Sequence, residues 1–183
     1  MRFADISTAA EAEGLALTGW FHPKADDKAP VGTATMLLFG YGGPSLWKAF
    51  RTSPEATDKS AHGLDRWSER VVTGLANQFG GEALFPFGGP PYQPFIRWTY
   101  AGEAIHQSKL GMSIHAERGL WSGWRGAVAL PERIDLPKIT TTDHLCAPCR
   151  AAGCLARRAC PVGRTFAQSA QQATFHLEAF RVA

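Results

Sequence analysis

The chain has 183 residues, of which 45% are hydrophobic and 19% are charged, and its formal net charge is +3. This length and composition suit one globular core with a small appendage, and they exclude an intrinsically disordered chain. So small a positive charge gives no basis for a nucleic-acid-binding protein.

The sequence has no targeting or membrane-spanning pattern. Residues 1–17 carry acidic groups where a signal peptide has basic ones, and no run of about 18 apolar residues occurs. We therefore predict a cytoplasmic protein with no membrane partner. In a reducing cytoplasm, clustered cysteines favour metal ligands or redox groups over disulfides.

The first part of the chain predicts a helix and two strands. Residues 7–13 are rich in alanine and glutamate and favour a short helix that Gly14 ends. Residues 15–21 alternate as a strand does, and 33–42 form a nearly continuous apolar strand, buried on both faces. A short helix is expected over 43–50.

The strongest helix prediction covers residues 64–79 and ends at Gly80. Apolar residues at three- and four-residue steps form one stripe, made of Leu64, Trp67, Val71, Leu75 and Phe79. The polar residues between them are predicted to face away from the stripe, namely Asp65, Arg66, Ser68 and Glu69.

The second part predicts a strand at 82–87, a helix at 95–105 and two core strands at 110–116 and 123–131. A linker follows from 131 to 143. Strands interleaved with helices predict an α+β sandwich, with the cysteine segment as a C-terminal extension. We place one domain over 1–138 and the cysteine-rich segment over 139–183.

Several residues of this body are candidates for binding a large planar cofactor. His115 ends a predicted strand, and Arg125 carries a fork of donors suited to an anion. Flat apolar surface would come from Tyr92, Phe95, Trp98, Tyr100, Trp121 and Trp124. The alternatives are a hydrogen-bonded structural histidine, an arginine bound to a local carbonyl, and aromatic side chains that belong to the core.

Other catalytic motifs find no support. The glycine-rich stretches 40–44 and 87–91 lack both the P-loop ending and the dinucleotide-binding pattern, so turns are predicted there. The chain contains no GxSxG and no HExxH, which leaves a hydrolase without a basis.

The stretch SIHAERGLWSGWRGAVALP, residues 113–131, resembles the strand–loop–strand signature of the CblC-type cyanocobalamin-processing family. Residues 33–50 and 62–75 are similar to that family in the order of strand, short helix and long helix. The body followed by a cysteine segment is also similar to epoxyqueuosine reductase and to corrinoid-dependent dehalogenases.

The resemblance implies a flavin-nitroreductase-like α+β fold that binds cobalamin. It places His115 near the lower face of the corrinoid and Arg125 on the side of the thiol or reductant. Ala116 replaces the proline that usually follows the histidine, and the catalytic acid region of epoxyqueuosine reductase has no match, so that reaction is not implied. A flavin in place of the corrinoid stays open, and flavin-reductase relatives make a homodimer one expected arrangement.

All four cysteines lie between residues 146 and 160, as Cys146-x2-Cys149-x4-Cys154-x5-Cys160-Pro161. The pattern resembles the ferredoxin run C-x2-C-x2-C-x3-C-P with two longer spacings. Thiolates select iron–sulfur clusters or zinc, and four of them suit a [4Fe–4S] cluster or a tetrahedral zinc ion. The proline after the last cysteine favours the cluster.

Together, these features predict an iron–sulfur protein that receives electrons from a redox partner protein and passes them to a corrinoid. As an enzyme it would be an oxidoreductase acting on cobalamin. Two alternatives remain open: a ferredoxin-like electron carrier without a corrinoid, and a zinc-stabilised binding domain with no redox role.

Overall fold

The structure is a computed structural model that describes residues 2–41, 44–58, 60–107, 113–116, 118 and 122–140. The chain divides into two compact units. The first unit comprises Met1–Glu103 and Gly123–Ile139, and the second comprises Ala104–Ser122 and Thr140–Ala183. The described elements of the first unit are α1 (Phe3–Ala12), β1 (Ala16–Phe21), the 3-10 turn η1 (Ala25–Asp27), β2 (Thr35–Gly40), α2 (Ser45–Arg51), α3 (Pro54–Thr57), α4 (Gly63–Phe79), β3 (Glu82–Leu84), α5 (Phe95–Gly102) and β6 (Trp124–Leu130).

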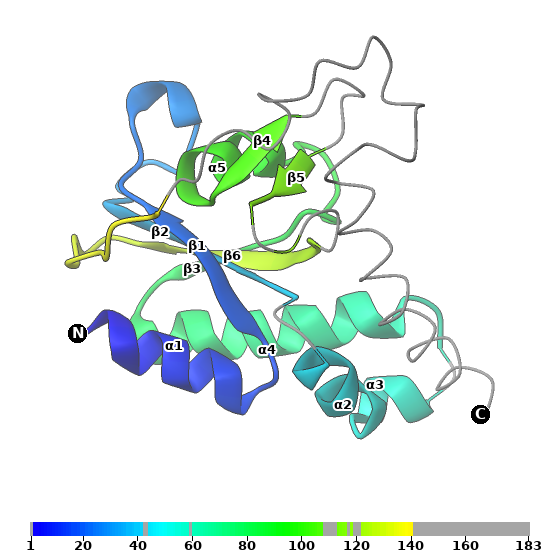
Figure 1. Ribbon diagram of the computed structural model, residues 1–183. Helices are drawn as coiled ribbons and strands as arrows, with labels where there is room; N and C mark the ends of the chain where they lie inside the picture. The colour runs from blue at the N-terminus through cyan, green and yellow to red at the C-terminus, as the bar shows by residue number, and fades with distance from the viewer. Residues whose placement is uncertain are drawn as a thin grey trace, which may run out of the picture. The chain divides into compact units, whose positions relative to one another are not determined.

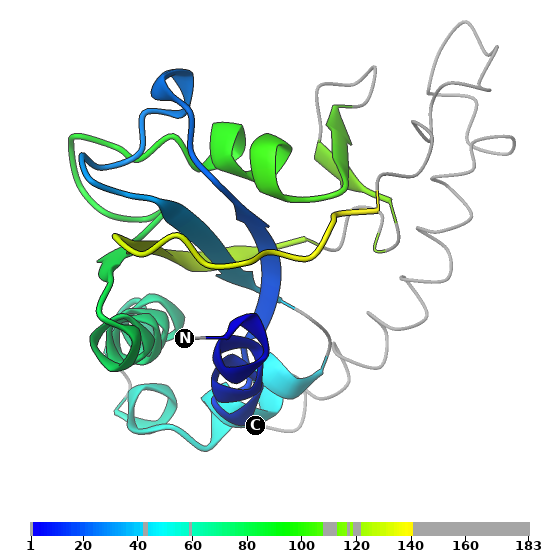
Figure 2. The same ribbon diagram turned by 90° about the vertical axis from the view of Figure 1, so that its left-hand side faces the viewer.

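The first unit is built on a four-stranded antiparallel sheet with the strand order β1-β2-β6-β3. Helices α1 and α4 lie against one face of this sheet and α5 lies against the other (Figures 1 and 2). The mixed α+β class is therefore confirmed. Within the described residues, no helix is long and apolar enough to cross a membrane.

Strand β2 occupies the centre of this arrangement, and all six of its residues are buried. Alternate side chains enter the two cores: Leu37 and Phe39 join the cluster beneath α4, while Met36 and Leu38 join the cluster beneath α5. The prediction of a strand buried on both faces is confirmed, because helices cover both faces of the sheet.

Helix α4 begins one residue before its predicted start and ends at the predicted residue, followed by Gly80 with φ +70°. The apolar stripe packs into the core as expected. Ser68 was predicted to face away, and this is wrong: the residue is fully buried, and its hydroxyl donates a 2.7 Å hydrogen bond to the Leu64 carbonyl. Ser68 lies four residues after Leu64 and three before Val71, so it shares their face.

Helix α5 ends earlier than predicted. The pattern over 95–105 predicts one helix, but the helix stops at Gly102 and Glu103 takes an extended conformation with φ −132° and ψ 161°. A Cβ at Gly102 would lie 2.8 Å from the Phe21 ring. The chain thus needs glycine where the helix end passes over β1.

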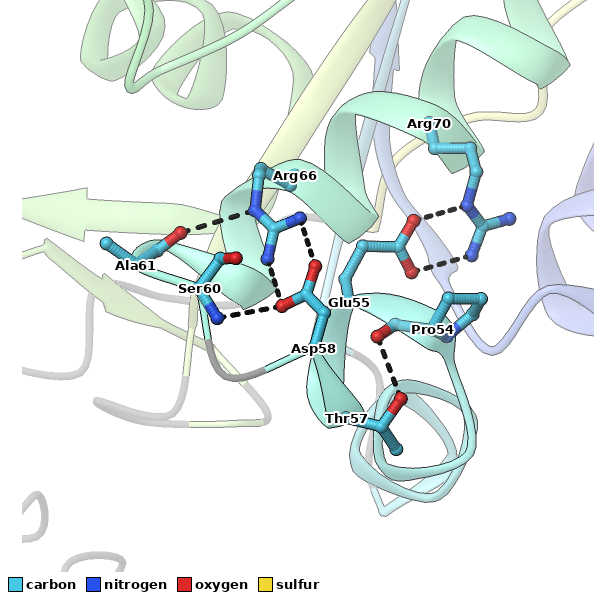
Figure 3. A network of polar contacts seen from close by, with 8 residues as sticks. All are labelled: Pro54, Glu55, Thr57, Asp58, Ser60, Ala61, Arg66 and Arg70. Carbon is cyan, nitrogen blue, oxygen red and sulfur yellow. Dashed lines mark hydrogen bonds and ion pairs between the residues drawn. The ribbon is translucent and has the colours of Figure 1, made fainter.

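The short helix α3 is held to α4 by two ion pairs (Figure 3). Arg66 donates to both carboxylate oxygens of Asp58 at 2.6 and 2.7 Å, and Arg70 donates to those of Glu55 at 2.6 and 3.1 Å. Both arginines lie on the outer side of α4. The pairs therefore fix α3 with paired N–H bonds rather than with a large apolar contact.

The described part of the second unit contains a two-stranded antiparallel ribbon of β4 (Ile105–Gln107) and β5 (Ser113–His115). Ile105 pairs with His115, and Gln107 pairs with Ser113. Strand β5 falls within the predicted strand 110–116. Of the predicted cysteine-rich segment 139–183, the structure describes residues 139 and 140, and all four cysteines lie outside the described residues.

Candidate functional site

Five of the predicted site residues lie outside the described residues: Trp121, Cys146, Cys149, Cys154 and Cys160. The other seven are described, six of them in the first unit (Tyr92, Phe95, Trp98, Tyr100, Trp124 and Arg125) and one, His115, in the second. Phe95 is 5% exposed and Tyr100 is 38% exposed.

His115 is a buried residue at the end of β5, with 6% of its surface exposed. Its Nδ1 accepts a hydrogen bond from the backbone N–H of Arg118 at 3.2 Å. Burial, the charge of Arg118 and nearby His106 together lower the pKa of His115 to about 4. The imidazole is therefore neutral at physiological pH, and its remaining proton resides on Nε2 because Nδ1 is an acceptor.

Trp124 begins β6 and packs against the core cluster beneath α5. Its indole Nε1 donates a 2.8 Å hydrogen bond to Oε1 of Glu103. One edge of this ring is therefore bound to a buried carboxyl group.

Arg125 is held from two sides within the first unit. Its Nη1 lies 3.2 Å from Oδ1 of Asp65 at the start of α4, and its Nε donates to the Trp124 carbonyl at 3.1 Å. The guanidinium carbon lies 5.7 Å from the centre of the Phe87 ring. The local-carbonyl alternative for Arg125 is thus present in the structure, together with a carboxylate partner.

Tyr92 and Trp98 lie in opposite environments. Tyr92 is 74% exposed, whereas Trp98 is fully buried against Phe95, with its Nε1 donating a 2.8 Å bond to the Asp27 carbonyl. Trp98 is a core residue in this structure and offers no surface to a ligand.

Trp124 and Arg125 are consecutive in sequence but turn toward different helices. Trp124 bonds to Glu103 after α5, while Arg125 bonds to Asp65 of α4, which covers the other face of the sheet. The strand pairing skips Arg125, because Gly40 pairs with Trp124 and Phe39 pairs with Gly126. This bulge changes the direction of the two side chains.

The sequence pattern does not identify the two acidic residues that hold Trp124 and Arg125, namely Glu103 and Asp65. It predicts Glu103 inside a helix and Asp65 on the outward face of another. No spacing rule links either residue to β6, because both contacts depend on the tertiary fold. Within the described residues, no group of three or more His, Cys, Asp or Glu side chains could hold a metal ion.

Comparison of the chain with protein-family models, with curated proteins and with solved structures finds no match.

Proposed function

We propose that this chain is an iron–sulfur redox protein. Cys146, Cys149, Cys154 and Cys160 would hold one [4Fe–4S] cluster, and an α+β body of the flavin-nitroreductase type would bind a corrinoid as the electron acceptor. The observation that carries this proposal is the run of four cysteines within 15 residues that ends in Cys160-Pro161.

The chemistry of the segment supports an iron–sulfur cluster. Thiolates are soft ligands, and with no further cysteines in the chain all four would serve one site. Four arginines are interleaved with these ligands or follow them, namely Arg150, Arg157, Arg158 and Arg164. Their charge would offset that of a thiolate-bound cluster and raise its reduction potential.

In the body, the proposal rests on the likeness of residues 113–131 to the CblC-type signature and on the state of His115. The neutral imidazole with its proton on Nε2 is suited to donate a hydrogen bond toward a corrinoid rather than to bind cobalt directly. Trp124 would supply an aromatic surface. Arg125 would bind an anion only through the guanidinium N–H groups that are not bonded to Asp65. Trp98 has no part in this proposal because it is buried.

Bound in this way, the cluster would supply single electrons to the corrinoid. The chain's own residues would position the acceptor, and a separate redox protein would deliver the electrons. No step of acid–base catalysis is assigned.

The test is anaerobic purification followed by iron, sulfide and zinc analysis of the wild type and of Cys146→Ser and Cys160→Ser. Ser169→Ala, a change in the same segment, is the matched control. We expect about four iron atoms per chain in the wild type and in the control, and a loss of iron in both cysteine variants. One zinc ion and no iron would overturn the cluster and select the zinc-stabilised domain.

The corrinoid is tested on the same samples by titration with hydroxocobalamin and, separately, with FMN. A saturable change in the corrinoid spectrum is expected. A cluster with no binding of either compound would select the ferredoxin-like carrier, and FMN binding alone would select the flavin version of the fold.

A further inference from the structure

Glu103 is a buried acidic residue with defined partners in the first unit, and only 5% of its surface is exposed. Its Oε1 accepts hydrogen bonds from the Thr18 hydroxyl and from the Trp124 indole, both at 2.8 Å. A carboxyl group removed from water is costly unless such bonds compensate it. The two hydrogen bonds to Oε1 therefore compensate part of the cost of burying the Glu103 carboxyl group.

Both donors lie where the strand register shifts. On β1, Leu17 pairs with Phe39 and Gly19 pairs with Leu38, so Thr18 is the extra residue of a bulge. The bulge at Arg125 adjoins Trp124 in the same way. Because bulges redirect side chains, these two irregularities account for donors from two different strands meeting at one oxygen.

Gly19 provides the space for this carboxyl group. A Cβ at position 19 would overlap Cγ of Glu103 and would lie 2.7 Å from the Gly102 carbonyl oxygen. A bulged threonine, the glycine beside it and the indole of Trp124 thus form one small site around Glu103.

The hydrogen bond from Trp124 to Glu103 joins the two points where the chain leaves and re-enters the first unit. Glu103 is the last residue of the first part of that unit, and Gly123 and Trp124 open its second part. Between them runs the segment 104–122, which carries His115 and Trp121. The distance between the two ends of this segment is therefore restrained by the bond from Trp124 to Glu103.

We propose that Glu103 is a positioning residue. Its carboxyl group fixes the indole of Trp124 in one orientation and holds together the two ends of the segment 104–122. This role rests on the proposed function only in that Trp124 forms part of the surface that receives the cofactor. The bond itself exists without any ligand.

The first arm of the test needs no cofactor. The full chain is prepared anaerobically with ¹⁵N-labelled tryptophan, and the indole N–H signal of Trp124 is assigned with Trp124→Phe. Glu103→Gln keeps an acceptor oxygen at this place and should retain the slow hydrogen exchange of that signal. Glu103→Leu should accelerate the exchange by about tenfold or more.

Leu75→Ala is the control for a general loss of stability. Leu75 is buried in the other core of the first unit, so its truncation destabilises the fold without touching Trp124. If Glu103→Leu leaves the Trp124 signal as it is in the wild type, or if Leu75→Ala moves it equally, the positioning role is overturned.

The second arm titrates the same variants with hydroxocobalamin. Binding should weaken by about tenfold in Glu103→Leu, equivalent to about 1.4 kcal/mol, and should be restored in Glu103→Gln. Equal binding by wild type and Glu103→Leu would overturn the link to the cofactor while the proposed function stands. The third outcome combines two results: indole exchange is faster in Glu103→Leu, and the wild type does not bind hydroxocobalamin. This outcome would overturn the corrinoid proposal and would still support the role of Glu103 in fixing Trp124.

Discussion

The carboxylate of Asp65 lies 3.2 Å from the guanidinium of Arg125, and the two side chains are only 32% and 20% exposed. Asp65 belongs to the first turn of α4, and Arg125 is the bulged residue of β6. The pair therefore connects the longest helix of the first unit to the irregular start of a central strand. It also determines how much of Arg125 is available to any ligand.

Asp65→Asn should lower the free energy of unfolding by about 1 kcal/mol, because Arg125 would keep its charge without a carboxylate partner. The negative charge at the helix N-terminus would be lost as well. Urea denaturation followed by circular dichroism measures the change. Glu69→Gln, on the exposed side of the same helix, is the control and should change stability by less than about 0.5 kcal/mol. Equal losses in both variants would contradict a specific role for the pair.

The ion pairs between α3 and α4 predict an acid-sensitive fold. Hydrogen bonds from Arg70 lower the pKa of Glu55 from 4.5 to about 2, and those from Arg66 lower the pKa of Asp58 from 3.8 to about 2. A carboxyl group with a lowered pKa in the folded state stabilises the fold above its unfolded-state pKa. That stabilisation is lost as the pH falls from about 4.5 toward 2.

Arg70→Gln should make the decrease of the thermal unfolding midpoint over this pH range smaller, because the largest cause of the lowered pKa of Glu55 would be lost. Arg51→Gln, at the exposed end of α2, is the matched control and should leave the profile unchanged. If the two variants show the same profile, the Glu55–Arg70 pair does not contribute to acid sensitivity.

His115 should remain neutral through the physiological range. Its pKa is lowered from 6.5 to about 4, so stability from this group is complete above 6.5 and declines as the pH falls toward 4. The pH dependence of the ring proton resonances measures this directly, with His115→Gln used for assignment. A midpoint near 6.5 would show that the imidazole is accessible to solvent and would remove the support for a neutral hydrogen-bond donor.

Two glycine substitutions should have opposite effects on stability. Gly19→Ala places a Cβ against the Glu103 side chain and the Gly102 carbonyl, and should cost about 1–3 kcal/mol. Gly74→Ala, within α4, meets no atom within 4 Å and should stabilise the fold by about 1 kcal/mol through helix propensity. Urea denaturation of both variants checks the pair, and stabilisation by Gly19→Ala would contradict the packing around Glu103.

Much of the fold follows from local patterns. The period of apolar residues predicts α4 to within one residue at its start, and the continuous apolar run predicts the buried strand β2. The pattern fails for Ser68 because serine counts as a polar residue in the sequence. In the structure its hydroxyl donates a hydrogen bond to the carbonyl four residues earlier, so the side chain can be buried. The pattern does not predict strand β4, because Ile105 falls within the predicted helix 95–105 and only two residues separate the end of α5 at Gly102 from the strand.

The candidate site is less predictable than the fold. Trp98 and Trp124 are both tryptophans near predicted element boundaries, yet one is fully buried and the other is bonded to Glu103. The sequence contains no sign of that difference, because it arises from a bulge on β6 and from the close approach of Gly19 and Glu103. Contacts between residues 85 or 60 positions apart, such as Thr18–Glu103 and Asp65–Arg125, require the three-dimensional structure.

The most direct test of the central claim is the metal content and visible spectrum of the protein purified without oxygen. We expect about four iron and four sulfide per chain, a brown thiolate-to-iron absorption, and the loss of both in Cys160→Ser. One zinc ion per chain with no iron and no visible absorption would contradict it.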